Sequence, residues 1–175
     1  ALRQVLASWL TYAFLWAISR AYLGWEFSHR VSYIVGDVNY YHNQINGGGG
    51  DIRRILVEYP TPVVWALDAL QLVTGADQRT FVVGFMMLML ALDAAMTWLL
   101  WVNGGRRRAA AVLAWIVFIT FMGPLAYVRF DLAPALLAGA AALYVHKKPA
   151  VAGGLVAIGA SLKLWPALLV LPLLG

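Results

Sequence analysis

Apolar residues form long continuous runs along most of the chain, and charged residues gather between the runs. Because these runs do not alternate with polar residues, they predict helices rather than the strands of a membrane barrel. We expect five membrane-spanning helices, over about residues 2–25, 80–102, 109–128, 132–145 and 149–174.

Several of these predicted spans are short or interrupted. Gly123-Pro124 should break the third span, and Lys163 and Trp165-Pro166 should break the fifth. Short or charge-bearing helices usually line a cavity rather than face lipid all round. The pattern therefore predicts a bundle whose later helices surround an interior site.

Between the first two spans lies a polar region, residues 26–79, which holds six of the eight carboxylates. Within it, residues 61–75 are apolar but too short to span, and Pro62 would lie in the first turn. We expect this segment to be a helix lying at the membrane surface. Four glycines, residues 47–50, predict a mobile loop before it.

Composition supports lipid as the solvent of this chain. It is 62% hydrophobic and 12% charged, with a mean hydropathy of +0.74, whereas an ordinary soluble domain is roughly one quarter charged. The prediction is an all-α, multi-pass transmembrane helical bundle, with residues 1–175 forming one transmembrane domain. The absence of an initial methionine and the apolar end indicate a piece of a longer protein.

The distribution of charge predicts an orientation and excludes some functions. Basic residues lie mostly at the ends of apolar runs rather than in one patch, so the net charge of +5 does not indicate nucleic-acid binding. If Arg3, residues 106–108 and residues 147–148 are cytoplasmic, five spans alternate without conflict. Region 26–79, Arg129 and Lys163 then lie outside the cytoplasm of a cell-membrane protein.

Familiar catalytic and cofactor motifs are missing from the sequence. There is no cysteine, no zinc-protease motif, no phosphate loop and no dinucleotide fingerprint, and the three histidines lack metal-ligand spacing. Asn39 stands where an Asp-x-Asp metal motif beginning at Asp37 would need its second aspartate. We expect no cofactor, and the sequence leaves open whether a divalent metal takes part.

Charged residues on the predicted outer side are the candidates for chemistry. They are Asp37, Glu58, Arg129 with Asp131, and Lys163. Arg129 and Lys163 run against the preference for basic residues on the cytoplasmic side, so each needs an anionic partner, such as a lipid phosphate.

Each charged residue also has a simpler interpretation. Asp37 could cap a helix, Arg129 and Asp131 could neutralise each other, and Lys163 could reach the interface through its aliphatic stem. Glu58 could pair with Arg53 or Arg54, and Arg20 in the first span could also reach the interface. For Asp93, in the second span, we expect a packed residue paired with a neighbouring helix.

Taken together, the candidate motifs resemble glycosyltransferase family 87, of the GT-C membrane fold. They are an aspartate shortly after the first span, Tyr59-Pro60 before the surface helix, Arg129-Phe130-Asp131-Leu132, and the stretch Leu-Lys-Leu-Trp-Pro at 162–166. The resemblance covers about residues 35–174, the N-terminal portion of a typical member. Thr61 interrupts the usual Tyr-Pro-Pro string, and the later helices are missing.

This resemblance implies a polyprenyl-phosphate-sugar-dependent hexosyltransferase, similar to α-1,2-mannosyltransferases. Such an enzyme passes a sugar, with inversion, to a hydroxyl of a glycolipid or glycan acceptor outside the cytoplasm. By position, Asp37 is the candidate general base, Arg129 and Lys163 the candidate holders of the phosphate, and Asp131 a residue that orients Arg129. The remaining candidates for contacts with sugar or acceptor are Tyr40, His42, Glu58 and Tyr59.

Two other classes of function remain open from the sequence. A multi-pass transporter also has broken helices and intramembrane charges, but we find no internal repeat, and the carboxylates gather in one region. A non-catalytic membrane assembly subunit is the third possibility, which a fully functional Asp37→Asn variant would favour.

Overall fold

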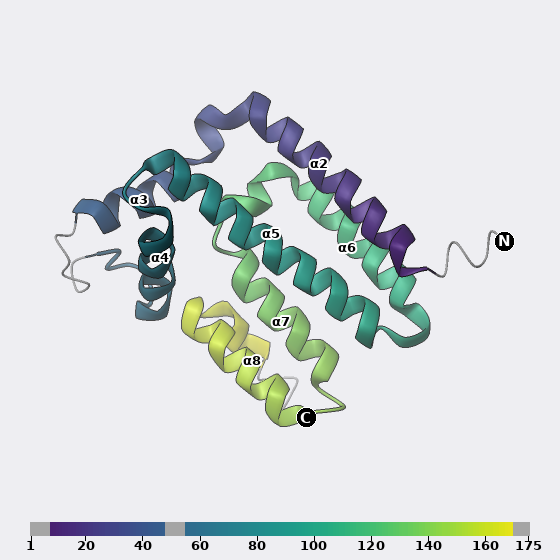
Figure 1. The fold of residues 1–175 in the computed structure, drawn as a ribbon. Coiled ribbons are helices and arrows are strands. Elements are labelled where there is room, and N and C mark those ends of the chain that lie inside the picture. The colour runs from purple at the N-terminus through teal and green to yellow at the C-terminus, as the bar shows by residue number, and fades with distance from the viewer. Residues whose placement is uncertain (1–7, 48–54, 170–175) are drawn as a thin grey trace.

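The computed structural model of the chain describes residues 8–47 and 55–169, and in this part the protein is built from helices without strands (Figure 1). The all-α prediction is therefore confirmed for the described residues. The elements are α2 (Trp9–Ile34), α3 (Gly36–Gly47), α4 (Thr61–Thr74), α5 (Gln78–Asn103), η2 (Gly105–Arg107), α6 (Arg108–Met122), η3 (Gly123–Tyr127), α7 (Leu132–Tyr144), α8 (Pro149–Leu162) and η4 (Trp165–Leu169).

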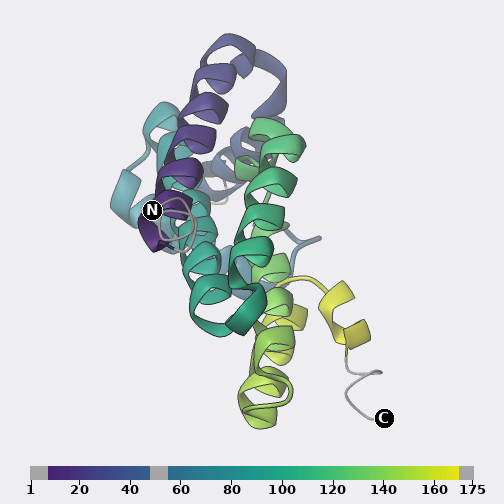
Figure 2. The ribbon, with the colours of Figure 1, turned by 90° about the vertical axis from the view of Figure 1, so that its right-hand side faces the viewer.

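Five helices lie side by side in an order that differs from their order in the chain. Contacts run from α2 to α6, from α6 to α5, from α5 to α7 and from α7 to α8 (Figure 1). The shorter helices α3 and α4 pack against each other and against α5, and Figure 2 shows the bundle from its side. This order places the junction between α6 and α7 close to α2, α5 and α3.

Among the described residues, two stretches are long and apolar enough to cross a membrane: α5, and the continuous segment Gly105–Tyr127. Only 28% of the most apolar window of each is buried within the chain, whereas the core helix of a soluble protein is mostly buried. Two shorter apolar helices, α7 and α8, follow. The second and third predicted spans thus correspond to helices of sufficient length.

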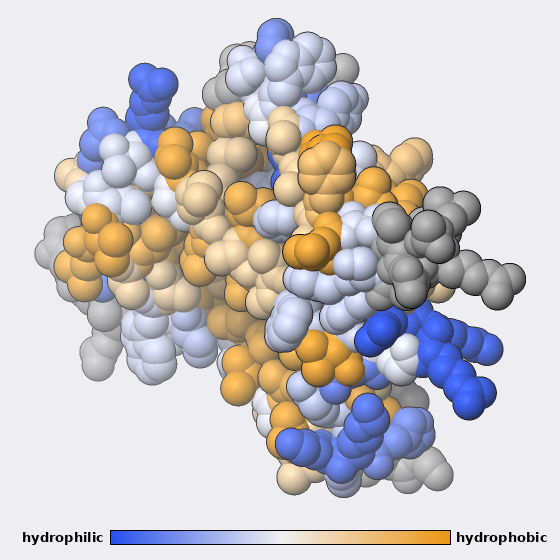
Figure 3. Space-filling view, turned by 45° about the vertical axis from the view of Figure 1, so that its right-hand side comes forward, coloured by the Kyte–Doolittle hydropathy of each residue, from blue (hydrophilic) through white to orange (hydrophobic). Residues whose placement is uncertain are grey.

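The outer surface of the bundle carries many large apolar side chains. On α2, Leu10, Phe14, Ile18 and Trp25 are exposed, while Leu23 on the other face is buried. Figure 3 shows apolar residues across the middle of one face, with hydrophilic residues gathered toward its ends. An outward apolar stripe of this kind suits contact with lipid.

Helix ends follow from local sequence. Asp77 caps α5 by accepting hydrogen bonds from the Thr80 amide (2.8 Å) and hydroxyl (2.7 Å). Gly123, at φ 68°, ends α6 in a left-handed conformation that glycine adopts without steric cost. Pro124 follows inside η3, so the predicted break at Gly123-Pro124 is confirmed.

The region between the first two predicted spans is more helical than the sequence suggested. Helix α2 continues past Trp25 to Ile34, α3 occupies Gly36–Gly47, and α4 matches the bounds of the helix expected over residues 61–75. Most of the glycine run, and Arg53 and Arg54, lie outside the described residues. The sequence pattern predicts no helix between residues 26 and 60, although polarity alone does not prevent one.

A buried ion pair and the donors around it join four elements of the bundle, α2, α5, α6 and η3. Arg20 on α2 donates from Nε (2.7 Å) and Nη2 (3.0 Å) to the carboxylate of Asp93 on α5. Trp16 and Trp115 add indole donors at 2.8 and 2.7 Å, and the Tyr127 hydroxyl donates at 2.8 Å. The expectation that Asp93 pairs with a neighbouring helix is confirmed. The interpretation that Arg20 reaches the membrane interface is wrong, because Arg20 is buried and pairs with Asp93.

Candidate functional site

Asp37 lies in the first turn of α3, where a carboxylate interacts favourably with the helix N-terminus. Its side chain accepts a hydrogen bond from Nη1 of Arg129, which is 92 positions away in the chain. Asp37 therefore lies near a helix terminus and is also the partner of a distant arginine.

Lys163 and Asp131 form a second ion pair beside the first. Lys163 follows the last residue of α8, where the backbone becomes extended. Within the described residues, Arg129 pairs with Asp37 and not with Asp131, so the expectation that Asp131 neutralises or orients Arg129 is wrong. Two residues apart on one tight turn, their side chains point to partners on different helices.

Buried neighbours hold the turn that carries Arg129. Val128 and Phe130, on either side of it, are buried, and so is Leu132 at the start of α7. The two charged side chains of this turn, Arg129 and Asp131, remain partly exposed. The backbone is therefore anchored in the core while the charges face outward.

Tyr40, one helical turn after Asp37, donates its hydroxyl hydrogen bond to Glu58. This bond lowers the pKa of the Glu58 carboxyl and raises the pKa of the Tyr40 hydroxyl, because it stabilises the charged acid and the neutral phenol. The structure thus brings together two residues that the sequence placed 18 positions apart. Whether Arg53 or Arg54 contacts Glu58 lies outside the described residues.

The next pair of tyrosines links the same two segments. The hydroxyls of Tyr41 and Tyr59 lie 3.2 Å apart. Burial is the first cause that raises the pKa of Tyr41, the bond to Tyr59 is the second, and the charges of Asp37 and Asp131 add to it. Tyr41 therefore lies near both carboxylates and stays a neutral hydroxyl beside them.

The segment that presents Glu58 and Tyr59 contains a strained residue. Leu56 has a positive φ of 49°, which is uncommon for a residue with a side chain. Its side chain is almost fully buried, so packing holds the strained turn. Strain of this kind is a recurrent feature of functional segments.

His42 is the candidate that the structure places apart from these charges. Its Nε2 lies 3.0 Å from the Ala76 carbonyl and 2.8 Å from the Asn46 amide nitrogen, and its ring packs against Phe81. These contacts tie α3 to the start of α5. They explain His42 as a structural residue, and its expected contact with sugar or acceptor remains a prediction.

An open cavity of about 390 Å³ lies between α6, η3 and the start of α7. Arg129 and Asp131 line it together with apolar side chains, among them Phe118, Met122 and Leu125. Those three side chains are also exposed on the outer surface. The cavity therefore combines apolar surface with a guanidinium and a carboxylate.

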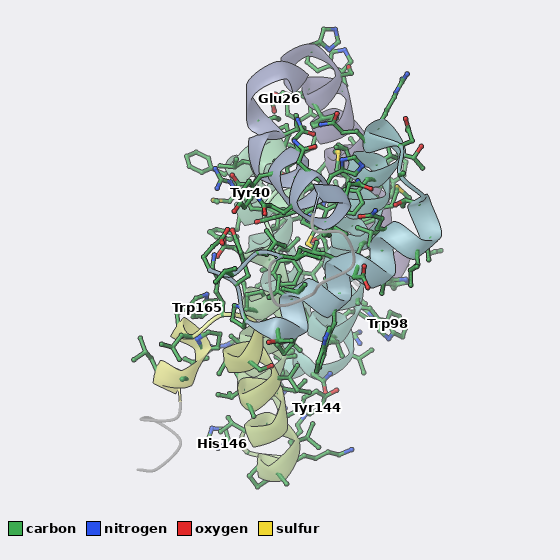
Figure 4. All side chains as sticks on the ribbon, turned by 90° about the vertical axis from the view of Figure 1, so that its left-hand side faces the viewer. Glu26, Tyr40, Trp98, Tyr144, His146 and Trp165 are labelled. Carbon is green, nitrogen blue, oxygen red and sulfur yellow. The ribbon has the colours of Figure 1, made fainter. Side chains whose placement is uncertain are left out.

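Figure 4 relates the site to the ends of the molecule. Glu26 lies near one end and His146 near the other, with Tyr40 and Trp165 between them. Trp165 begins η4, two residues after Lys163. Among the described residues, no three His, Cys, Asp or Glu side chains are grouped to hold a metal ion.

Sequence reasoning missed part of this arrangement. Tyr41 and Tyr127 were not singled out, although the doublet Tyr40-Tyr41 and the position of Tyr127 before Arg129 are visible in the sequence. Comparisons with protein-family models, curated proteins and solved structures gave no match. The case for a function therefore rests on these residues and on their geometry.

Proposed function

We propose that this chain belongs to a membrane glycosyltransferase of GT-C type. It would move a hexose, mannose being our first choice, from a polyprenyl-phosphate carrier to an acceptor hydroxyl outside the cytoplasm. In this proposal five helices span the cell membrane, and the segments carrying Asp37, Arg129 and Lys163 lie on the extracytoplasmic side.

One observation carries the proposal. Arg129 pairs with the candidate base Asp37 and also lines the apolar cavity between α6, η3 and α7. A lipid-linked phosphate needs both features in one place: apolar surface for the isoprenoid chain and a cation for the phosphate. Lys163 is paired with Asp131, two residues from Arg129, and supplies a second cation.

The chemistry needs one base and no acid. The acceptor oxygen attacks the anomeric carbon, the bond from that carbon to the phosphate oxygen breaks, and the hydroxyl proton passes to the Asp37 carboxylate. The electron pair of the broken bond stays on the phosphate, where Arg129 and Lys163 offset the negative charge. A phosphate leaves readily, so a second carboxylic acid is not required, unlike in glycosidases.

The four charged residues of the two ion pairs sum to zero charge. When the donor binds, its phosphate takes the place of Asp37 on Arg129, and this exchange frees the carboxylate for the acceptor hydroxyl. Half-exposed ion pairs contribute little to stability, typically about 0–1 kcal/mol, so separating Arg129 from Asp37 costs little free energy. Tyr40, Glu58 and Tyr59 lie next to this position and supply polar contacts for sugar or acceptor.

The test is an assay of the full-length protein in membranes with radiolabelled polyprenyl-phosphate mannose. Asp37→Asn should lower the rate by about 10²-fold or more, because it removes the general base. Asp68→Asn is the matched control: it neutralises another carboxylate of region 26–79, on α4, and should leave the rate unchanged. Expression of all three proteins is compared in the same membranes.

The other outcomes assign the function differently. Equal transfer by wild type and Asp37→Asn would keep the enzyme and move the base, with Glu58 next in line. No transfer by wild type from any lipid-linked sugar would contradict the proposal and favour a transporter or an assembly subunit.

A further inference from the structure

We propose that Tyr127 is a positioning residue: its hydroxyl, held by buried Asp93, sets the place of Arg129 opposite Asp37. The inference rests on the proposed function for its effect on transfer, but its geometric content is independent of it. It connects the buried ion pair of the bundle to the exposed ion pair of the site.

The anchor at the start of this connection is rigid. Asp93 is fully buried, and both of its carboxylate oxygens accept hydrogen bonds from donors on α2, α6 and η3. Arg20 on α2 is itself held by the Ser19 hydroxyl at 2.8 Å. A carboxylate with this many partners in a dry interior does not reorient without losing several of them.

The path from the anchor to the site is two residues long. Tyr127 ends η3, Val128 is fully buried, and Arg129 follows. Two residues span at most about 7 Å of chain, so a shift of the Tyr127 ring moves the Arg129 backbone directly.

The backbone hydrogen bond that closes η3 is long. The hydrogen bond from the Val128 amide to the Leu125 carbonyl is 3.3 Å long, beyond the usual range of about 2.7–3.2 Å. The tie from Tyr127 to Asp93, at 2.8 Å, is shorter. The Tyr127 side chain therefore adds a tie to the core beside the backbone bonds that hold the turn carrying Arg129.

The chain offers a matched control for this tie. Trp16 on α2 donates to the same Oδ2 of Asp93 at the same distance of 2.8 Å. Trp16→Phe and Tyr127→Phe each remove one donor from that atom, but only Tyr127 is connected to Arg129 by a short path. Tyr127→Phe is also the smaller change in volume, so general loss of packing would affect Trp16→Phe more.

The first readout is steady-state transfer by the full-length protein. Tyr127→Phe should raise the KM for the lipid-linked donor or lower kcat, by up to about 10²-fold if Arg129 moves by about 1 Å. Trp16→Phe should stay within about twofold of wild type. Equal losses in both variants would overturn the inference, because they would report general destabilisation.

The second readout does not need the transferase activity. These 175 residues contain no cysteine; with any cysteine elsewhere in the full-length protein replaced by serine, Asp37→Cys and Arg129→Cys introduce two sites for spin labels that report the backbone positions of α3 and of the turn after η3. In the full-length protein in lipid nanodiscs, Tyr127→Phe should broaden or shift the distance distribution between labels at 37 and 129, and Trp16→Phe should not. Identical distributions in all three backgrounds would overturn the inference whatever the assay shows. A selective change at Tyr127, with no transfer by wild type, would uphold the positioning role and reject the proposed function.

Discussion

The protein holds ion pairs in two contrasting settings. The side chains of Arg20 and Asp93 are 4% and 0% exposed. Those of Arg129 and Asp37 are 47% and 32% exposed, and those of Lys163 and Asp131 are 40% and 54% exposed. The buried pair is surrounded by further donors, whereas each exposed pair is a single contact between two segments.

This difference separates a structural role from the chemical role that we propose for the exposed pairs. A buried charge pair is costly to break, because either partner left alone keeps its charge without water. An exposed pair loses little when one partner turns away, because water or another ion replaces it. The interior pair therefore suits a fixed scaffold, and the exposed pairs suit exchange with an anionic ligand.

The largest effect should come from breaking the buried pair. Arg20→Met leaves the Asp93 carboxylate buried without its countercharge and should lower the free energy of unfolding by about 3–5 kcal/mol. Denaturant unfolding in detergent micelles measures this, with tryptophan fluorescence as the signal, since Trp16 and Trp115 contact the carboxylate.

An exposed arginine gives the control for this comparison. Arg106 lies in η2 at the surface, and Arg106→Met should change the free energy of unfolding by less than about 0.5 kcal/mol. Equal effects of Arg20→Met and Arg106→Met would contradict the distinction between a scaffold pair and the rest.

A smaller effect on stability, with a larger one on activity, is expected at the exposed pair. Arg129→Gln should change the free energy of unfolding by at most about 1 kcal/mol. If the proposed function holds, the same variant should lose about 10²-fold of its transfer rate, because a donor to the leaving phosphate is gone. Unfolding and transfer are both measured on one preparation of the variant. A loss of stability as large as that of Arg20→Met would contradict the distinction between the buried and the exposed ion pairs.

Local signals in the sequence predicted much of the fold. The apolar runs bounded by Asn103-Gly104 and by Gly123-Pro124 placed α5 and α6 to within a few residues, because breakers act on the backbone near them. The sequence analysis ended the first helix at residue 25, where the chain becomes polar, and so missed the continuation of α2 through residues 26–34. Polar residues do not by themselves break a helix. This part of α2 is stabilised by packing against other elements, which one stretch of sequence does not show.

Partnerships across the chain were beyond local signals. Arg129 looked paired with Asp131 two positions away, but the fold brings it Asp37 from 92 positions away and gives Asp131 to Lys163. The same holds for Arg20, whose partner Asp93 is 73 positions distant. Sequence identified these residues as charges that needed partners, while helix packing decided which partners they have.

The smallest effect concerns the neutral-to-charged contact beside the exposed pairs, between Tyr40 and Glu58. Its hydrogen bond holds the pKa of Glu58 below the ordinary 4.5 and that of Tyr40 above the ordinary 10.0. A lowered acid pKa means that the contact stabilises the fold above pH 4.5 and is lost as the pH falls through the Glu58 pKa. A raised phenol pKa means that the contact persists up to pH 10.0 and is lost as the pH rises through the Tyr40 pKa.

Glu26 and Glu58 are the two glutamates of the chain, so NMR titration of protein labelled with ¹³C-glutamate should resolve both. In Tyr40→Phe the pKa of Glu58 should rise toward 4.5 while the Glu26 signal stays unchanged, and an unmoved Glu58 titration would mean that Tyr40 does not hold this carboxylate in solution.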